Sequence, residues 1–352
     1  MSENPEDWEI NIEKTEDPEE LEPDFAHFEI MNYPADTTLN GYKEQMDNKQ
    51  LVIPKFQRKF IWDQVRASKL IESFLLGLPV PGVFLFKERN SPQYLVIDGN
   101  QRINTVVSFF KGLIKDRKFK LKGVSSKWEG KSYEDLNEDE QFKLSTAVMR
   151  ATIIQQLNPK DQSSIYYIFE RLNTGGVNLN PMEVRMCVSE GSFTELLKEL
   201  NTLLGWRKLI QRPKENPRAR DIELILRAFA LHERSDEYDK PMKKFLNDYI
   251  GDNKSKDEIC IEEKRLLFSK AIEKIKELEK PFHLKGKLNY AVLDSILVAL
   301  MDSPLTENQE IKDAYQALVK KDDYIEATSK NTSDKSEITK RIQITKSIFR
   351  VS

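Results

Sequence analysis

Cysteine and histidine are scarce in this sequence of 352 residues, which holds two of the first and three of the second. Cys187 and Cys260 lie far apart, so their spacing fits neither a disulfide framework nor a metal site, and we expect a reducing, cytoplasmic setting. A nuclease of the His-metal kind needs several histidines around one ion. We expect no such nuclease, and no Ser-His-Asp or Cys-His catalytic site, because the histidines are isolated: His27, His232 and His283.

Long apolar runs are also missing. A membrane-spanning helix needs about 18 consecutive apolar residues, and no stretch approaches that length. The first residues are acidic and do not form a basic start followed by an apolar run, so we expect no secretory signal. With 39% hydrophobic and 32% charged residues, the composition indicates a water-soluble protein with no membrane partner.

Basic residues are nearly absent from the first 24 positions, where Lys14 stands among eleven Asp and Glu. The whole chain carries a net charge of −3 and this segment −10, so the rest carries +7. Low hydrophobicity with high charge is typical of a disordered leader, which is either solvated or covers a basic groove in place of phosphate. The mildly basic body permits nucleotide or nucleic-acid binding without requiring it.

From about residue 36 the sequence becomes globular, and its periodicity divides it into two halves. The first half mixes both periods, with helices expected at 38–46, 63–76, 100–110 and 138–148 and strands at 51–53, 83–86, 94–97 and 151–155. Asp63 is the expected N-cap of the second helix and Gly77 its end. The strands at 83–86 and 94–97 are expected to form a hairpin.

Beyond about residue 190 the apolar spacing is helical almost throughout. Helices are expected at 193–206, 219–232, 240–250, 259–279, 289–301, 308–318 and 339–349. The predicted class is therefore α+β, in which a mixed domain precedes an all-α domain. We expect an acidic leader at 1–24, the mixed domain at 25–190 and the helical domain at 191–352.

The stretch from Tyr94 to Phe110 carries the clearest site signal, since a short strand, a polar turn and a helix follow one another. A turn with Gly99 at a helix start offers backbone N–H groups and the positive end of the helix dipole to an anion. Arg102 adds a guanidinium suited to phosphate. Asp98 could orient Arg102, hold a metal ion or polarise a hydroxyl. The structural alternative is a corner that an Asp–Arg pair holds shut.

Two other segments also place an Arg or an amide side chain beside a turn. One runs from Ile53 to Trp62 through Gln57 and Arg58, and the other from Phe169 through Asn173 to Gly176. The three segments could converge on a phosphate-accepting pocket. The aromatic residues of the first segment could stack on a base, but a role in the core is favoured for Phe56 and Trp62.

These three segments, in this order, resemble the prokaryotic GmrSD-type family, named for the N-terminal domain of modification-dependent restriction enzymes. That family is marked by an Ile-Pro…Gln-Arg…Trp segment, an Asp-Gly-Gln-Gln-Arg box and a Phe…Asn-(Thr/Ser)-x-Gly segment. The resemblance covers roughly residues 37–190. Asn100 departs from the box, where the family has Gln, and shortens the amide side chain by one methylene.

The resemblance implies a core similar to the ParB/sulfiredoxin fold and an NTP-binding, NTP-hydrolysing module of phage defence or modification-dependent restriction that acts on or near DNA. It implies an NTP with Mg²⁺ as cofactors. Asp98 and Arg102 would be catalytic, and Asp98 would also hold the metal. Nucleotide and phosphate contacts would come from Gln57, Arg58, Gly99, Asn100, Gln101, Asn173 and Gly176.

Two other functions remain open from the sequence. In the first, the same Arg residues bind a DNA backbone, and the chain binds or cleaves DNA without NTP hydrolysis. In the second, the chain is a non-enzymatic subunit whose helical half recruits a separately encoded nuclease. A further basic cluster could touch a nucleic-acid backbone or form a solvated loop: Arg212, Lys214, Arg218 and Arg220.

Overall fold

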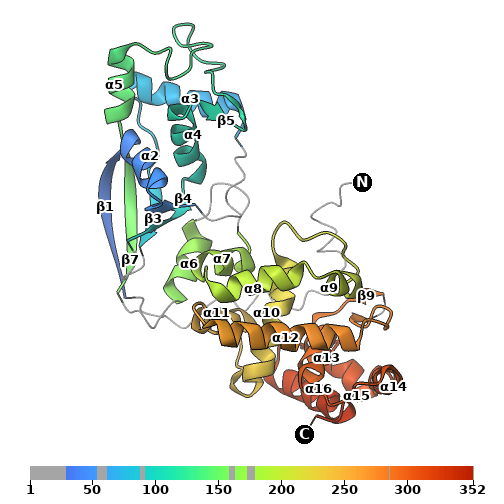
Figure 1. Ribbon diagram of the computed structural model, residues 1–352. Coiled ribbons are helices and arrows are strands. Elements are labelled where there is room, and N and C mark those ends of the chain that lie inside the picture. Colours follow the sequence, from blue (N-terminus) through green and yellow to red (C-terminus); the bar gives the residue numbers. More distant parts are fainter. Residues whose placement is uncertain are drawn as a thin grey trace. The chain divides into compact units, whose positions relative to one another are not determined.

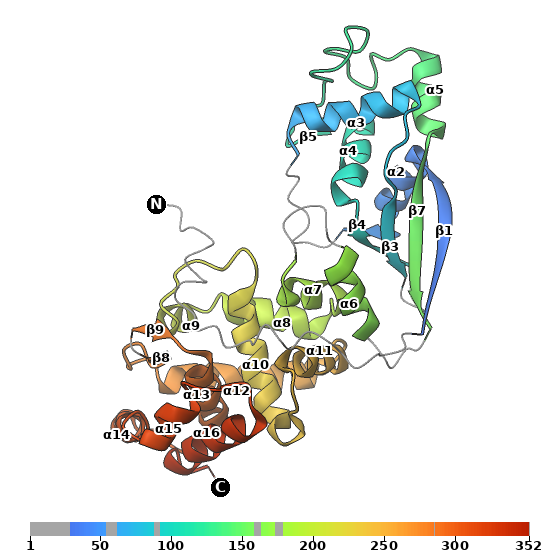
Figure 2. The same cartoon turned by 180° about the vertical axis from the view of Figure 1, so that it is seen from behind.

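The computed structural model describes residues 29–53, 62–87, 92–157, 163–172, 179–284 and 286–351, apart from the side chains of 163, 164 and 170. These residues fall into two compact units, one within His27–Leu179 and the other from Asn180 onward. The elements of both units appear in Figures 1 and 2. Among the described residues, no helix is long and apolar enough to cross a membrane.

The first unit contains a mixed sheet, in which five strands of the described residues lie in the order β1-β7-β3-β4-β2. Its strands are β1 (Ile30–Thr38), β2 (Leu51–Val52), β3 (Val83–Lys87), β4 (Tyr94–Asp98) and β7 (Val148–Gln156). β3 and β4 form the predicted antiparallel hairpin, while β3 pairs with β7 in parallel. β1 pairs with β7 in antiparallel register over nine residues, and this strand was not predicted.

The helices of this unit are α2 (Leu39–Asp47), α3 (Gln64–Leu76), α4 (Asn100–Phe110), α5 (Glu138–Thr146) and α6 (Ser163–Leu172). The predicted ends of α3 are confirmed, because Asp63 accepts from the Arg66 N–H at 2.7 Å and Gly77 adopts φ +77°. The apolar faces of α2, α3 and α4 share one buried core with β3, β4 and β7. That core holds the strand–turn–helix corner of β4 and α4 in place.

The segment between α4 and β7 carries a small hairpin, β5 (Leu113–Ile114) and β6 (Arg117–Lys118), followed by α5. Trp128 anchors this segment, because its ring is buried and its Nε1 donates to Glu140 Oε1 at 2.8 Å. This segment is therefore packed onto the core of the first unit.

The described residues of the second unit are helical apart from one small hairpin, β8 (His283–Leu284) with β9 (Lys287–Leu288). Its helices are α7 (Pro181–Val188), α8 (Ser192–Asn201), α9 (Leu204–Leu209), α10 (Arg220–Arg234), η2 (Ser235–Glu237), α11 (Met242–Asp252), α12 (Glu258–Lys274), α13 (Tyr290–Asp302), α14 (Asn308–Leu318), α15 (Asp322–Ala327) and α16 (Lys335–Ile348). α13 is buried along its whole length except at Asp302, so it forms the centre of the unit.

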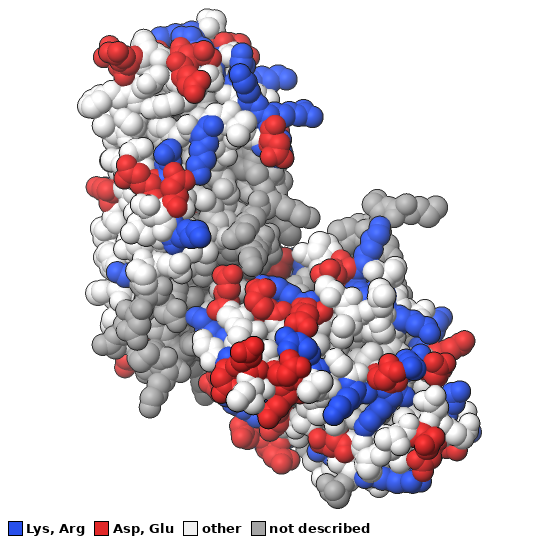
Figure 3. Space-filling model, viewed as in Figure 1, with Lys and Arg blue, Asp and Glu red and all other residues white. Residues whose placement is uncertain are grey.

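An α+β unit followed by helices is the predicted class, which is confirmed. Several details differ from the prediction, among them the helix expected at 259–279, which ends at Lys274. The helix expected at 193–206 is interrupted after Asn201, where Leu203 takes an extended ψ of 125°. The units divide at residue 179, ahead of α7, because α7 packs against α10 and α11. Lys, Arg, Asp and Glu are interspersed over the face of the second unit seen in Figure 3.

Candidate phosphate site at the β4–α4 corner

The corner between β4 and α4 depends on Gly99. This residue is buried at φ +95°, and an added Cβ atom would lie 2.3 Å from Val83 Cγ1. A side chain therefore has no room between the turn and β3. Gly99 is also the N-cap of α4 and makes no side-chain cap, so the first helical amides receive no acceptor from the cap residue.

Asp98 and Arg102 lie one helical turn apart across this corner. Nη2 of Arg102 donates to Asp98 Oδ2 at 2.9 Å and to the Gly82 carbonyl at 2.9 Å. Of the three roles predicted for Asp98, the structure shows the orientation of Arg102 directly. Nε of Arg102 is buried and has no hydrogen-bond partner among the described residues. An unpaired buried donor costs roughly 1–3 kcal/mol, so this guanidinium has unused capacity to donate.

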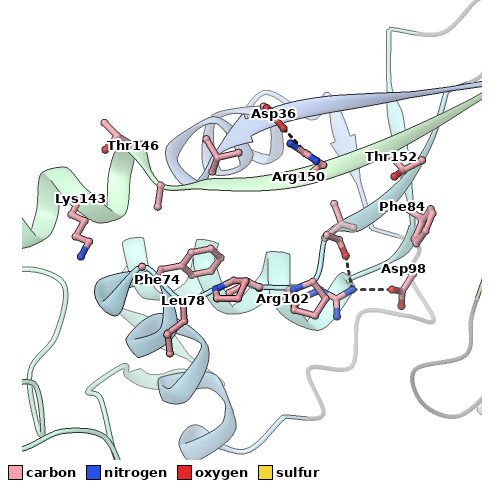
Figure 4. A pocket seen from close by; sticks show the side chains of 18 residues that line it. Asp36, Phe74, Leu78, Phe84, Asp98, Arg102, Lys143, Thr146, Arg150 and Thr152 are labelled. Atoms are coloured by element: carbon pink, nitrogen blue, oxygen red, sulfur yellow. Dashed lines mark hydrogen bonds and ion pairs between the residues drawn. The ribbon is translucent and has the colours of Figure 1, made fainter.

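The pair lines an open pocket of about 1080 Å³ (Figure 4). Its wall is built from the loop between α3 and β3, the ends of β3 and β4, the last turn of α5 and the start of β7. Cations from three elements line it: Arg102, Lys143 and Arg150. Apolar side chains line the rest, among them Phe74, Leu78, Val80 and Phe84. Two carboxylates, Asp36 and Asp98, also line it, so the pocket offers an excess of one positive charge and an apolar wall.

Sequence reasoning did not find Lys143 and Arg150. Arg150 Nε donates to Asp36 Oδ1 at 3.0 Å, and both side chains remain exposed. Asp36 lies on β1 and Arg150 on β7, so only the pairing of those strands brings them together. Arg150 lies in an alternating pattern typical of a strand. Nothing in its neighbouring sequence predicts that it shares a pocket with Arg102.

The two amides of the box lie apart from this pocket. Oε1 of Gln101 accepts from the Trp62 N–H at 3.2 Å, which connects the second motif to the end of the first. Asn100 Oδ1 accepts from Asn104 Nδ2 at 2.5 Å, so its shorter side chain is engaged within α4. Trp62 packs against the core of the unit, which is the role favoured for it.

The other predicted contacts cannot be placed. Gln57 and Arg58 of the first motif, and Asn173 and Gly176 of the third, lie outside the described residues. α6, which leads into the third motif, packs against β4, the strand that ends at Asp98. The described ends of the first and third motifs, Trp62 and α6, therefore contact the α4 and β4 elements of the second motif.

A metal site formed by the protein alone is not supported in the part of the chain that the structure describes. No three His, Cys, Asp or Glu residues come together there. Asp98 could still contribute a single carboxylate, because Mg²⁺ is often held by one or two carboxylates with substrate phosphates and water. A metal ion at Asp98 would therefore need further ligands from outside the protein.

Comparison with known families gives a match that includes the β4–α4 corner. Residues 38–188 match the family described as GmrSD restriction endonuclease, N-terminal domain. We call this matched segment the GmrSD-type domain. The GmrSD-type domain thus covers all of the first unit except β1, together with α7. No curated protein and no solved structure matches the chain, so the likeness to the ParB/sulfiredoxin fold stays a prediction.

Proposed function

We propose that the pocket beside Asp98 and Arg102 binds the phosphates of an NTP, and that the GmrSD-type domain hydrolyses this nucleotide as part of a phage-defence restriction system acting on DNA. The family match supports a restriction module. The observation that best supports nucleotide binding is the position of Arg102. Its guanidinium is held in the pocket wall by Asp98 and Gly82 while a buried Nε donor is left over.

The surroundings of Arg102 favour a nucleotide over a bare anion. Lys143 and Arg150 add positive charge for further phosphate oxygens, and α4 directs the positive end of its dipole to the corner. Phe84 and the other apolar side chains provide a wall against which a base or a sugar can lie. In the alternative without hydrolysis, a DNA backbone occupies the same pocket. A sugar-phosphate backbone alone does not require an apolar wall.

Mg²⁺ would supply charge neutralisation between the phosphates when bound. Asp98 would contribute its carboxylate to the ion or orient the attacking water, while Arg102 would hold a phosphate. Asp98 is already fixed by Arg102, so the carboxylate needs no rearrangement to take either role.

Calorimetric titration of the full chain with each of the four NTPs, with and without Mg²⁺, tests the proposal. We expect binding by the wild type and a loss of roughly ten- to hundredfold in affinity for Arg102→Ala, since a hydrogen bond to a charged group contributes about 1.5–3 kcal/mol. Arg117→Ala is the matched control, because Arg117 is exposed on β6 outside the pocket.

The control should bind within about twofold of the wild type, as a distant surface charge contributes little. Arg102→Lys keeps a cation at the site and tests the same position if Arg102→Ala unfolds. Unchanged affinity in a folded Arg102 variant, or no NTP binding by the wild type, contradicts the proposal.

A further inference from the structure

The segment from Lys208 near the end of α9 to Arg220 at the start of α10 lies in the second unit and takes no part in the pocket. We call it the basic loop. Between residues 208 and 220 the sequence holds one acid, Glu215, and five cations: Lys208, Arg212, Lys214, Arg218 and Arg220. Lys208 and Lys214 are exposed, and the three arginines are half-buried. Arg218 is paired with Glu183, since its Nη2 donates to Glu183 Oε2 at 3.1 Å.

A buried arginine holds the basic loop from the inside. The side chain of Arg207 is 6% exposed, and its Nη1 donates to Asp221 Oδ2 at 2.6 Å. Nε of Arg207 donates to the Arg212 carbonyl at 2.8 Å, and Nη2 donates to the Lys214 carbonyl. One guanidinium thus fixes the backbone at two of the cationic positions.

The far end of the basic loop is held in the same way. Asp221 Oδ2 also accepts from the Asn216 N–H at 2.8 Å, and Asn216 Oδ1 accepts from the Arg218 N–H at 2.8 Å. Asn180 Nδ2 donates to the Arg218 carbonyl at 2.8 Å. A run of charges on a solvated loop does not require these buried contacts. Here they give the cations a fixed backbone.

The β8–β9 hairpin continues this positive surface. It lies beside α9 in both views (Figures 1 and 2). Burial, followed by the positive charges of Lys280 and Arg212, lowers the pKa of His283. Arg212 and the hairpin therefore lie close enough to share one positive field. Lys280 and Lys287 are exposed at the two ends of the hairpin.

We propose that the basic loop, with Lys280 and Lys287, binds the phosphate backbone of duplex DNA independently of the nucleotide pocket. Charges are mixed over the face of this unit seen in Figure 3, so overall charge does not select the partner. The local run of five cations with one acid favours a phosphate backbone instead. Binding costs less affinity here, because Arg207, Asp221 and Asn180 have already ordered the loop. DNA is the polyanion on which a restriction module acts.

The test is fluorescence anisotropy of a labelled DNA duplex against the full chain over a salt series from about 50 to 200 mM, in which each phosphate contact contributes roughly 0.9 to the slope of log K against log salt. For Lys208→Ala/Lys214→Ala we expect at least about tenfold weaker binding near 100 mM salt and a slope smaller by about 1.8. Lys320→Ala/Lys321→Ala removes the same charge from exposed positions after α14 and should leave the slope unchanged.

Titration with NTP separates this site from the pocket. The Lys208→Ala/Lys214→Ala variant should bind nucleotide as the wild type does, whereas Arg102→Ala should keep the salt slope for DNA. Equal losses in the two double variants would overturn the proposal, because a general charge effect would then explain them. So would wild-type binding to duplex DNA with no salt dependence.

Discussion

Val83 stands where a side chain on Gly99 would have to be, with its Cγ1 atom 2.3 Å from the position of a Cβ. The backbone of Val83 is also close, since its Cα would lie 3.2 Å from that Cβ. The turn that carries the Asp98–Arg102 pair is therefore specified by the strand beside it.

Gly99→Ala should be strongly destabilising. We expect a loss of about 2–4 kcal/mol in the free energy of unfolding, measured by urea denaturation, from the clash and from the positive φ. Gly112→Ala is the control, because Gly112 has φ +70° with nothing within 4 Å and reports the backbone strain alone. Val83→Ala should partly relieve Gly99→Ala, so the double variant should lose less than the sum of the two singles. If the loss in the double variant equals the sum of the losses in the two single variants, the clash is unimportant.

Asp98→Asn should separate hydrolysis from binding. The amide keeps an oxygen for Arg102 but removes the charge that a metal ion or an attacking water needs, so we expect phosphate release to fall by about a hundredfold or more while NTP affinity changes by only a few-fold. Asp36→Asn is the matched control, as Asp36 lines the same pocket and also pairs with an arginine. If both variants hydrolyse NTP at the same rate, Asp98 has no special role.

Arg207→Ala should destabilise the second unit by about 3–5 kcal/mol, because it leaves the carboxylate of Asp221 buried without its partner. Chemical unfolding followed by circular dichroism measures this loss. The exposed pair of Lys244 and Asp248 offers a comparison, and Lys244→Ala should cost less than about 0.5 kcal/mol. Similar losses in the two variants would contradict the structural role given to Arg207.

Glu140 should make the first unit sensitive to acid. Burial opposes ionisation of this carboxylate, but hydrogen bonds from Lys127, Trp128 and the Asn137 N–H lower its pKa from 4.5 to about 2. Its contribution to stability is then complete above about pH 4.5 and is lost as the pH falls toward 2. Glu140→Gln should flatten the fall in unfolding free energy over that range. Glu138→Gln, at an exposed position in the same helix, should leave it unchanged.

Much of the first unit can be predicted from short stretches of the sequence. Asp63 and Gly77 have the chemistry of helix caps, and the apolar spacing around them gives α3. The β3–β4 hairpin and α4 follow in the same way from strand and turn residues. The corner at Asp98–Arg102 could be recognised for the same reason, since all its residues lie within one short stretch.

The rest depends on pairing between distant residues. β1 was missed because its sequence includes Pro34 and lacks clear apolar alternation, features that only an edge strand tolerates. The carbonyl of Gly82 and the side chains of Lys143 and Arg150 reach the pocket from separate elements, so no sequence window contains them together. The helix expected at 193–206 ends early because Asn201 turns its side chain to Trp206 and Arg207.

The pairing of β1 with β7 also decides where the GmrSD-type domain can be separated from the rest of the chain. The family match begins at residue 38, where β1 ends. A fragment cut at that limit would lose the strand that covers β7 along nine residues and would expose a row of unpaired backbone N–H and C=O groups. Such an edge is a template for association between copies. The smallest piece that keeps β7 fully paired on that side must begin at or before Ile30.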